Sequence, residues 1–178
     1  MPGRDIPLVN GEIYHVFNRG INPQKIFNCD RDYHQFLDRL KYYQNNNLPT
    51  SYSHLIDLPL LARKDFLNQL SRKKDFLVSI IAFCLMPNHF HLLLKQLVEN
   101  GIAKYISNLT NSYTKYFNIR CKRVGPIFQG KFKAVRVSTD EQLCHLSRYF
   151  HLNPYSAGIV VDLKKLSNYP YSSLSEFI

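Results

Sequence analysis

The sequence predicts an α+β domain built on an antiparallel sheet of about four strands, with helices packed mainly on one face. Segments rich in β-forming residues, such as Glu12–Asn18 and Phe76–Leu85, alternate with segments of helical periodicity, such as Asp30–Asn45 and Gly101–Arg120. This alternation, in a chain of 178 residues, is typical of one domain with its own hydrophobic core. We therefore expect a single domain over residues 1–178.

In the first half of the chain, the predicted strand Glu12–Asn18 ends at a turn signal, Arg19–Pro23. The next segment, about 30–45, is predicted to be a helix because apolar side chains recur in it at helical spacing. Residues 46–60 are rich in Pro, Asn and Ser and predict a connection, and residues 61–74 predict a short charged helix. We interpret about 46–74 as an insertion.

In the second half, the continuous apolar run 76–85 predicts a buried central strand. The turn Met86-Pro87-Asn88 then leads into a third strand that ends near Lys95. A long helix is predicted over about 101–120, and residues 126–137 contain a fourth strand with a break at Gly130.

The last predicted helix opens at Thr139, whose hydroxyl is a typical N-cap, followed by two acidic residues. We expect this helix to end around Asn153, because Pro154 disfavours helical backbone at the residue before it. A short tail then closes the chain.

The net charge is +10, and the stretch between Glu99 and Asp140 carries no acidic residue. Such a one-sided segment generates a positive field that suits a phosphate backbone, and interleaved aromatic rings could stack on bases. The alternatives are a hydrated basic surface without a partner, and aromatic rings that belong to the core. The cations that we expect to bind nucleic acid are Arg19, Lys115, Arg120, Lys122, Arg123, Lys131, Lys133, Arg136 and Arg148.

The four cysteines form no CxxC pair, which favours a reducing compartment over a disulfide framework or a zinc knuckle. No apolar run approaches the roughly 18 residues of a membrane span, and Met1–Asp5 lacks the apolar core of a signal peptide. The expected location is therefore the cytoplasm, with the protein associated with the nucleoid when it binds DNA, and no membrane partner is expected.

Two histidines, His89 and His91, flank Phe90 on the third predicted strand. Successive strand side chains point to opposite faces, so the histidines share one face while Phe90, Leu92 and Leu94 share the other. Two imidazoles about 7 Å apart at Cα can converge on one metal ion. The alternative is a pair of hydrogen-bonded structural histidines.

Tyr149 and Asn153 lie four residues apart on the last predicted helix and so share a face, together with His145. Asn153 offers an amide oxygen as a third metal ligand, and Tyr149 offers a hydroxyl that can attack phosphorus. A tyrosine hydroxyl has a pKa of about 10 in water, so it needs help from a metal or a base. Two imidazoles and one amide oxygen suit Mn²⁺, or Mg²⁺ if water and phosphate fill the remaining positions. The alternative is an amphipathic helix whose polar side faces water.

Two segments, Met86–Leu94 and Arg148–Pro154, resemble the single-tyrosine HUH transposases, especially the REP-associated tyrosine transposases and related small insertion-sequence transposases. Tyr14–Gly20 and Gly125–Lys133 resemble further segments of that family. Together these segments cover the chain almost from end to end, in the expected order.

The resemblance implies a ferredoxin-like (RRM-like) sheet of the HUH endonuclease fold. It also implies His89, His91 and Asn153 as ligands of a divalent metal, Mg²⁺ or Mn²⁺, and Tyr149 as the nucleophile. Such enzymes cut single-stranded DNA near hairpins, forming a 5′-phosphotyrosine link and a free 3′-hydroxyl, and need no nucleotide cofactor. Some relatives are homodimers with the tyrosine helix supplied in trans and others are monomers, and the sequence leaves both states open.

Three other functions compete with a DNA-cutting transposase. A catalytically silent protein of the same fold would bind DNA or RNA hairpins without cutting them, and a metal-dependent RNA-processing enzyme would depend on the 2′-hydroxyl. A plain metallohydrolase leaves the basic stretch and Tyr149 without a role. Among rival nucleophiles, Tyr105, Tyr113 and Tyr116 lack a following proline and a polar ligand one turn later. We interpret His151, on another helix face, as structural or as a phosphate contact.

Overall fold

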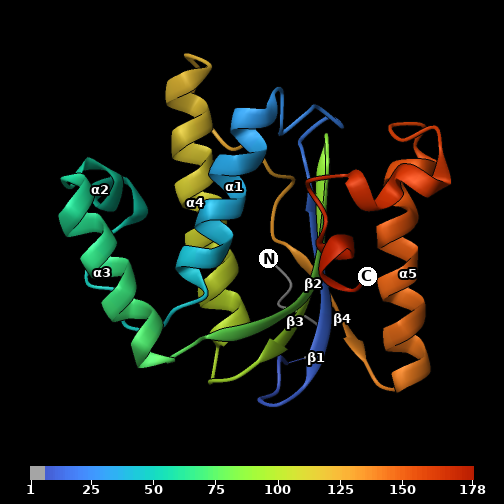
Figure 1. The fold of residues 1–178 in the computed structure, drawn as a ribbon, viewed down its shortest axis with the longest axis horizontal. Helices are drawn as coiled ribbons and strands as arrows, with labels where there is room; N and C mark the ends of the chain where they lie inside the picture. The colour runs from blue at the N-terminus through green and yellow to red at the C-terminus, as the bar shows by residue number, and fades with distance from the viewer. Residues whose placement is uncertain (1–6) are drawn as a thin grey trace.

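The structure is a computed structural model that describes residues 7–178 (Figure 1), so the start of the chain, where no signal-peptide core is expected, lies outside the described residues. The elements are β1 (Ile13–Arg19), α1 (Asp30–Tyr43), α2 (Tyr52–Asp57), α3 (Leu60–Lys73), β2 (Val78–Met86), β3 (His89–Gln96), α4 (Gly101–Arg120), β4 (Lys133–Val137) and α5 (Asp140–Ser156), followed by the 3-10 helices η1 (Leu163–Asn168) and η2 (Ser173–Glu176). None of the helices in this part of the chain is long and apolar enough to cross a membrane.

The four strands form one antiparallel sheet in the order β2-β3-β1-β4. Without α2 and α3, the elements up to β4 follow the βαββαβ sequence of a ferredoxin-like fold. The predicted α+β class with an antiparallel sheet of four strands is therefore confirmed. In the register of the two central strands, Phe17 lies opposite His91 and Arg19 lies opposite His89.

Helices α1 and α4 cover one face of the sheet, and α5 packs on the other face (Figure 1). The main core lies under α1 and α4, where Phe36 meets Phe90 with ring centroids 5.3 Å apart. Under α5, the rings of His15 and His91 stack against Phe150. Helix α5 therefore covers part of the face of β3 that carries His89 and His91.

Two predictions of secondary structure were wrong. The connection 46–60 contains the short helix α2, whose N-cap Ser51 accepts a hydrogen bond from the backbone N–H of His54. Helix α5 also continues past Asn153 to Ser156, with Pro154 inside it. Pro154 is buried, and its carbonyl accepts hydrogen bonds from the two residues 159 and 160, so packing and the following turn outweigh its local preference.

The C-terminal segment 169–173 closes the outer edge of β2. The backbone N–H of Leu85 donates to the carbonyl of Tyr171 at 2.8 Å, and that of Phe83 donates to the Ser173 hydroxyl at 2.9 Å. The Tyr169 hydroxyl donates in turn to the carbonyl of Leu85 at 2.7 Å. Residues far apart in sequence thus complete the sheet.

A buried carboxylate ties the start of α1 to the end of α4. The Asp32 side chain is fully buried and accepts from Arg120 at 2.6 Å, from the Tyr116 hydroxyl at 3.0 Å and from the backbone N–H of Asn28 at 2.8 Å. Arg120 keeps 28% of its side chain exposed, so the arginine side of this ion pair still contacts water. The pair fixes α1 against α4.

We expect Asp32→Ala to lower the free energy of unfolding by about 2–4 kcal/mol. Truncation removes three hydrogen bonds to a charged acceptor and leaves donors without a partner, although the exposed side of Arg120 keeps its water. Urea unfolding followed by circular dichroism measures the change. Asp57→Ala, at an exposed carboxylate of α2, is the control and should stay within about 0.5 kcal/mol of wild type. Equal unfolding midpoints for the two variants would contradict the role given to Asp32.

Candidate active site

The structure brings His89, His91 and Tyr149 to the wall of one cavity of about 630 Å³. The rings of His89 and His91 lie 4.9 Å apart and nearly perpendicular, and the Tyr149 ring lies 6.4 Å from that of His91. Three further cations, Arg19, Lys131 and Lys133, line the same cavity. A strand that carries two histidines, a helix that carries a tyrosine and three cationic side chains therefore meet at one place.

The turn before His89 is held by backbone hydrogen bonds from the segment that follows β1. The N–H groups of Ile26 and Phe27 both donate to the carbonyl of Pro87, and the N–H of Gly20 donates to the carbonyl of Asn88 at 2.8 Å. A Cβ on Gly20 would lie 2.3 Å from a neighbouring backbone carbonyl, so only glycine allows this close approach. The position of His89 is thus fixed by main-chain contacts.

One ring nitrogen of each histidine is engaged within the protein. Nδ1 of His89 lies 2.6 Å from Oδ1 of Asn88, and Nδ1 of His91 lies 2.8 Å from Nε2 of His15. Within residues 7–178, neither Nε2 atom has a protein hydrogen-bond partner. Metal-bound histidines characteristically show this pattern, in which the second nitrogen is held by another group.

Burial keeps these imidazoles neutral. It lowers the pKa of His15 to about 4 and, together with the nearby His89 and His15, lowers the pKa of His91 to about 3. Burial and the charge of Arg19 also lower the pKa of His89. At pH 7 the His15–His91 contact therefore holds a single proton, and a cation at Nε2 of His91 requires that proton on Nδ1, donated to Nε2 of His15.

Helix α5 presents Tyr149 to the cavity because the next residue, Phe150, is fully buried against His91 with the two rings parallel and 6.0 Å apart. Tyr149 itself is 53% exposed. Asn153 lies one turn further along α5 and is half-buried, but it does not line the cavity. His145 is exposed, and buried His151 lies 3.0 Å from the Ser173 hydroxyl, which makes it structural.

The three rival tyrosines are engaged elsewhere. The hydroxyls of Tyr105 and Tyr113 donate to backbone carbonyls in the core, and that of Tyr116 donates to Asp32. Burial raises the pKa of Tyr105 and Tyr113, and burial together with Asp32 raises the pKa of Tyr116 to about 12. None of the three lines the candidate active site.

The predicted nucleic-acid-binding cations are not all brought together. Arg19, Lys131 and Lys133 line the cavity, and Arg19 hydrogen-bonds to Gln129 there. Arg120 is paired with Asp32, and Arg136 is paired with Glu12 at 2.8 Å. Lys115, Lys122, Arg123 and Arg148 do not line this cavity, and Arg148 is exposed on α5 beside Tyr149.

His15 is the residue at this site whose role the sequence analysis missed. Alternation along β1 already places His15, Phe17 and Arg19 on one face, but pairing this face with His89 and His91 needs the strand order and register. The contact of Phe150 with His91 could not be foreseen without the packing of α5.

Within the described residues, no group of three or more His, Cys, Asp and Glu side chains is arranged to hold a metal ion. The predicted donor set consists of two histidines and an asparagine, which is a different combination. The free Nε2 atoms of His89 and His91, with both second nitrogens held, fit a divalent cation on chemical grounds.

The comparisons with known proteins concern the family and the fold of the chain. The family model of the IS200-like transposases matches residues 62–153, more than half of the chain. The solved structure of a REP-associated tyrosine transposase bound to a REP hairpin has 16% sequence identity and a TM-score of 0.61, covering 99% of this chain and 84% of that one, so the two share a fold. A transposase structure from Deinococcus radiodurans R1 is 14% identical with a TM-score of 0.43, covering 84% and 94% of the two chains. No curated protein matches the sequence. The chain belongs to the family of IS200-like transposases.

Proposed function

We propose that this transposase cuts and rejoins single-stranded DNA near hairpins, with Tyr149 as the nucleophile and a divalent metal held by His89 and His91. The observation that carries the proposal is the convergence of both histidines, Tyr149 and three cations on one cavity. The hairpin bound to the REP-associated relative supports the choice of DNA partner.

In the cleavage step, the Tyr149 oxygen forms a bond to phosphorus and the bond from phosphorus to the 3′ oxygen breaks. Tyr149 loses its proton and the 3′ oxygen gains one, which leaves a 5′-phosphotyrosine and a free 3′-hydroxyl. The exposure of Tyr149 at the mouth of the cavity gives a DNA strand access to it. The reverse reaction joins strands without an external energy source, because the phosphodiester energy stays in the covalent link.

The two histidines would hold Mn²⁺ or Mg²⁺ through their Nε2 atoms, with Asn153 as a candidate third ligand. The metal would polarise the scissile phosphate and favour ionisation of the tyrosine. His15 would orient the His91 ring and fix its tautomer, and Asn88 would do the same for His89. Arg19, Lys131 and Lys133 would hold the phosphates on either side of the scissile bond.

The test is a denaturing gel of the protein incubated with labelled single-stranded hairpins and Mn²⁺. The hairpins are drawn from the flanks of its own gene. A covalent protein–DNA band that requires the metal supports the proposal. Tight hairpin binding without any covalent band would replace it by a silent hairpin-binding protein.

We expect Lys131→Ala with Lys133→Ala to weaken hairpin binding and to flatten its salt dependence. Each phosphate contact that is lost reduces the slope of log K against log salt by about one unit. Fluorescence anisotropy at several salt concentrations measures the slope. Lys164→Ala, on exposed η1 away from the cavity, should leave it unchanged. An identical slope in the double variant would remove the two lysines from the interface.

A further inference from the structure

We propose that a second cavity, between α4 and the loop 125–132, binds one unpaired nucleotide of the same DNA strand. This cavity also measures about 630 Å³, and it shares Asn18 and Lys131 with the candidate active site. The inference rests on the proposed function, since it concerns the DNA that the active site would cut. The nucleotide bound there would not take part in the cleavage reaction.

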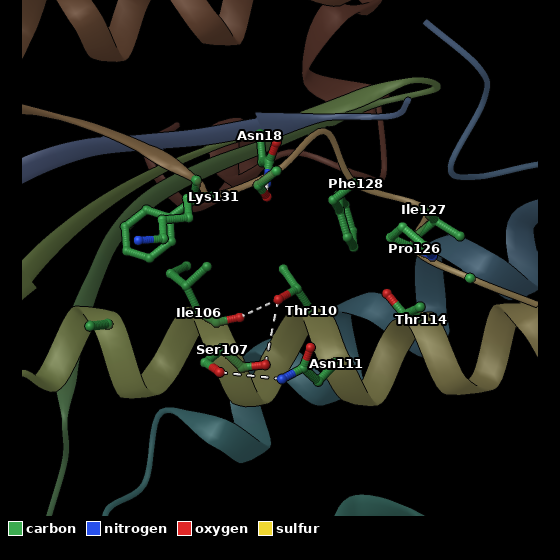
Figure 2. A pocket seen from close by; sticks show the side chains of 14 residues that line it. Asn18, Ile106, Ser107, Thr110, Asn111, Thr114, Pro126, Ile127, Phe128 and Lys131 are labelled. Atoms are coloured by element: carbon green, nitrogen blue, oxygen red, sulfur yellow. Dashed lines mark hydrogen bonds between the residues drawn. The ribbon is translucent and has the colours of Figure 1, made fainter. Parts of the chain in front are cut away.

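The two walls of this cavity differ in chemistry (Figure 2). On α4, Ser107, Thr110, Asn111 and Thr114 follow one another at helical spacing, so their polar groups form a row along one face. Across the cavity from this row stands an apolar wall in the loop, formed by Pro126, Ile127 and Phe128. A flat heterocycle with a polar edge matches such a pair of walls.

Part of the polar row is available for a ligand. Thr110 donates to the carbonyl of Ile106 at 2.7 Å, and the amide nitrogen of Asn111 donates to the Ser107 hydroxyl at 3.3 Å. The carbonyl oxygen of Asn111 and the hydroxyl of Thr114 have no partner within residues 7–178. One acceptor and one group that both donates and accepts suit a base edge, which presents donors and acceptors together.

The charge around the cavity favours a phosphorylated ligand. The sequence from Gly101 to Lys131, which supplies nearly the whole lining, contains no acidic residue. Lys131 stands between the two cavities, where its ammonium group can contact a phosphate that links a nucleotide in one to a nucleotide in the other. Adjacent nucleotides of one strand, rather than a separate small molecule, are therefore the occupant that we infer.

The experiment measures binding of hairpins in which each unpaired nucleotide beside the stem is made abasic in turn, with EDTA present so that no cleavage occurs. For wild type, we expect one position at which loss of the base weakens binding about tenfold. In Thr114→Leu combined with Asn111→Leu, that penalty should disappear while the penalties at other positions stay. Asn108→Leu makes the same change on α4 beside a different hollow and should keep the wild-type pattern.

A second measurement needs no variant. 2-Aminopurine placed at the sensitive position should change its fluorescence on binding, because the base moves from water to a site beside the apolar wall of Pro126, Ile127 and Phe128. The proposal is overturned if no position responds, or if the double variant keeps every abasic penalty. If wild type then still forms the metal-dependent covalent band, the proposed function stands without this cavity. Absence of both hairpin binding and the covalent band would remove the two proposals together.

Discussion

Tyr149→Phe is expected to abolish the covalent protein–DNA band while hairpin affinity stays within about twofold of wild type. The variant removes only the oxygen that would bond to phosphorus. The ring remains, and because it is about half exposed, its packing contributes little to stability. The measurements are the denaturing gel with Mn²⁺ and anisotropy titration of the same hairpin, with both proteins side by side.

Tyr155→Phe provides the matched control, because Tyr155 is a second exposed tyrosine on α5 that does not line the cavity. It should form the covalent band at the wild-type rate. A band that survives in Tyr149→Phe would show that another residue attacks the phosphorus. In that case the buried tyrosines would remain poor candidates, since their hydroxyls are already engaged.

His91→Ala is expected to reduce metal-dependent adduct formation by on the order of a hundredfold or more, since it removes one of the two proposed imidazole ligands and, with it, part of the proposed charge stabilisation at phosphorus. The adduct rate at a series of Mn²⁺ concentrations measures the loss. His145→Ala, at an exposed histidine of α5 outside the cavity, should behave as wild type. If His91→Ala cleaves with unchanged metal dependence, the metal lies elsewhere.

Substitutions of His15 test the same proposed metal site through the residue that contacts His91. His15→Phe keeps a ring between Phe17 and Phe150 but loses the nitrogen that faces Nδ1 of His91. The Mn²⁺ concentration for half-maximal rate should then rise about 10- to 100-fold, while hairpin affinity measured in EDTA should not change. His15→Gln, which restores a polar partner, should recover part of the metal affinity. A merely structural role for His15 would lower stability and leave the metal dependence unaltered.

The sequence predicted most of the fold because its signals are local. Alternation defined β1, the apolar run defined β2, and helical periodicity defined α1 and α4 within a few residues. Helix α2 was missed because its six residues give too short a pattern, and its stability comes from the Ser51 cap and from burial of Tyr52 and Leu55. Helix α5 was predicted to end too early, at Asn153, because tertiary packing overrides the local backbone preference at Pro154.

The candidate site was also predicted where its signals are local and was missed where they depend on tertiary packing. His89 and His91 could be placed on one face from the period of a strand, and Tyr149 on a helix face from its spacing to Asn153. That the two faces meet depends on α5 packing against the sheet through Phe150, a contact between residues about 60 positions apart. The partners of the basic residues follow the same rule: no local pattern distinguishes Arg120, paired with Asp32, from Lys131, which lines the cavity.

The segment 169–173 has a consequence for folding of the protein during its synthesis. Strand β2 is apolar and, among the described residues, is paired by β3 on one side and by segment 169–173 on the other. During synthesis this edge of β2 therefore stays uncovered until residues 169–173 have left the ribosome, and an uncovered apolar edge recruits strands from other molecules. A nascent or truncated chain that lacks residues 169–178 should aggregate. Segment 169–173 is thus expected to protect the solubility of the domain.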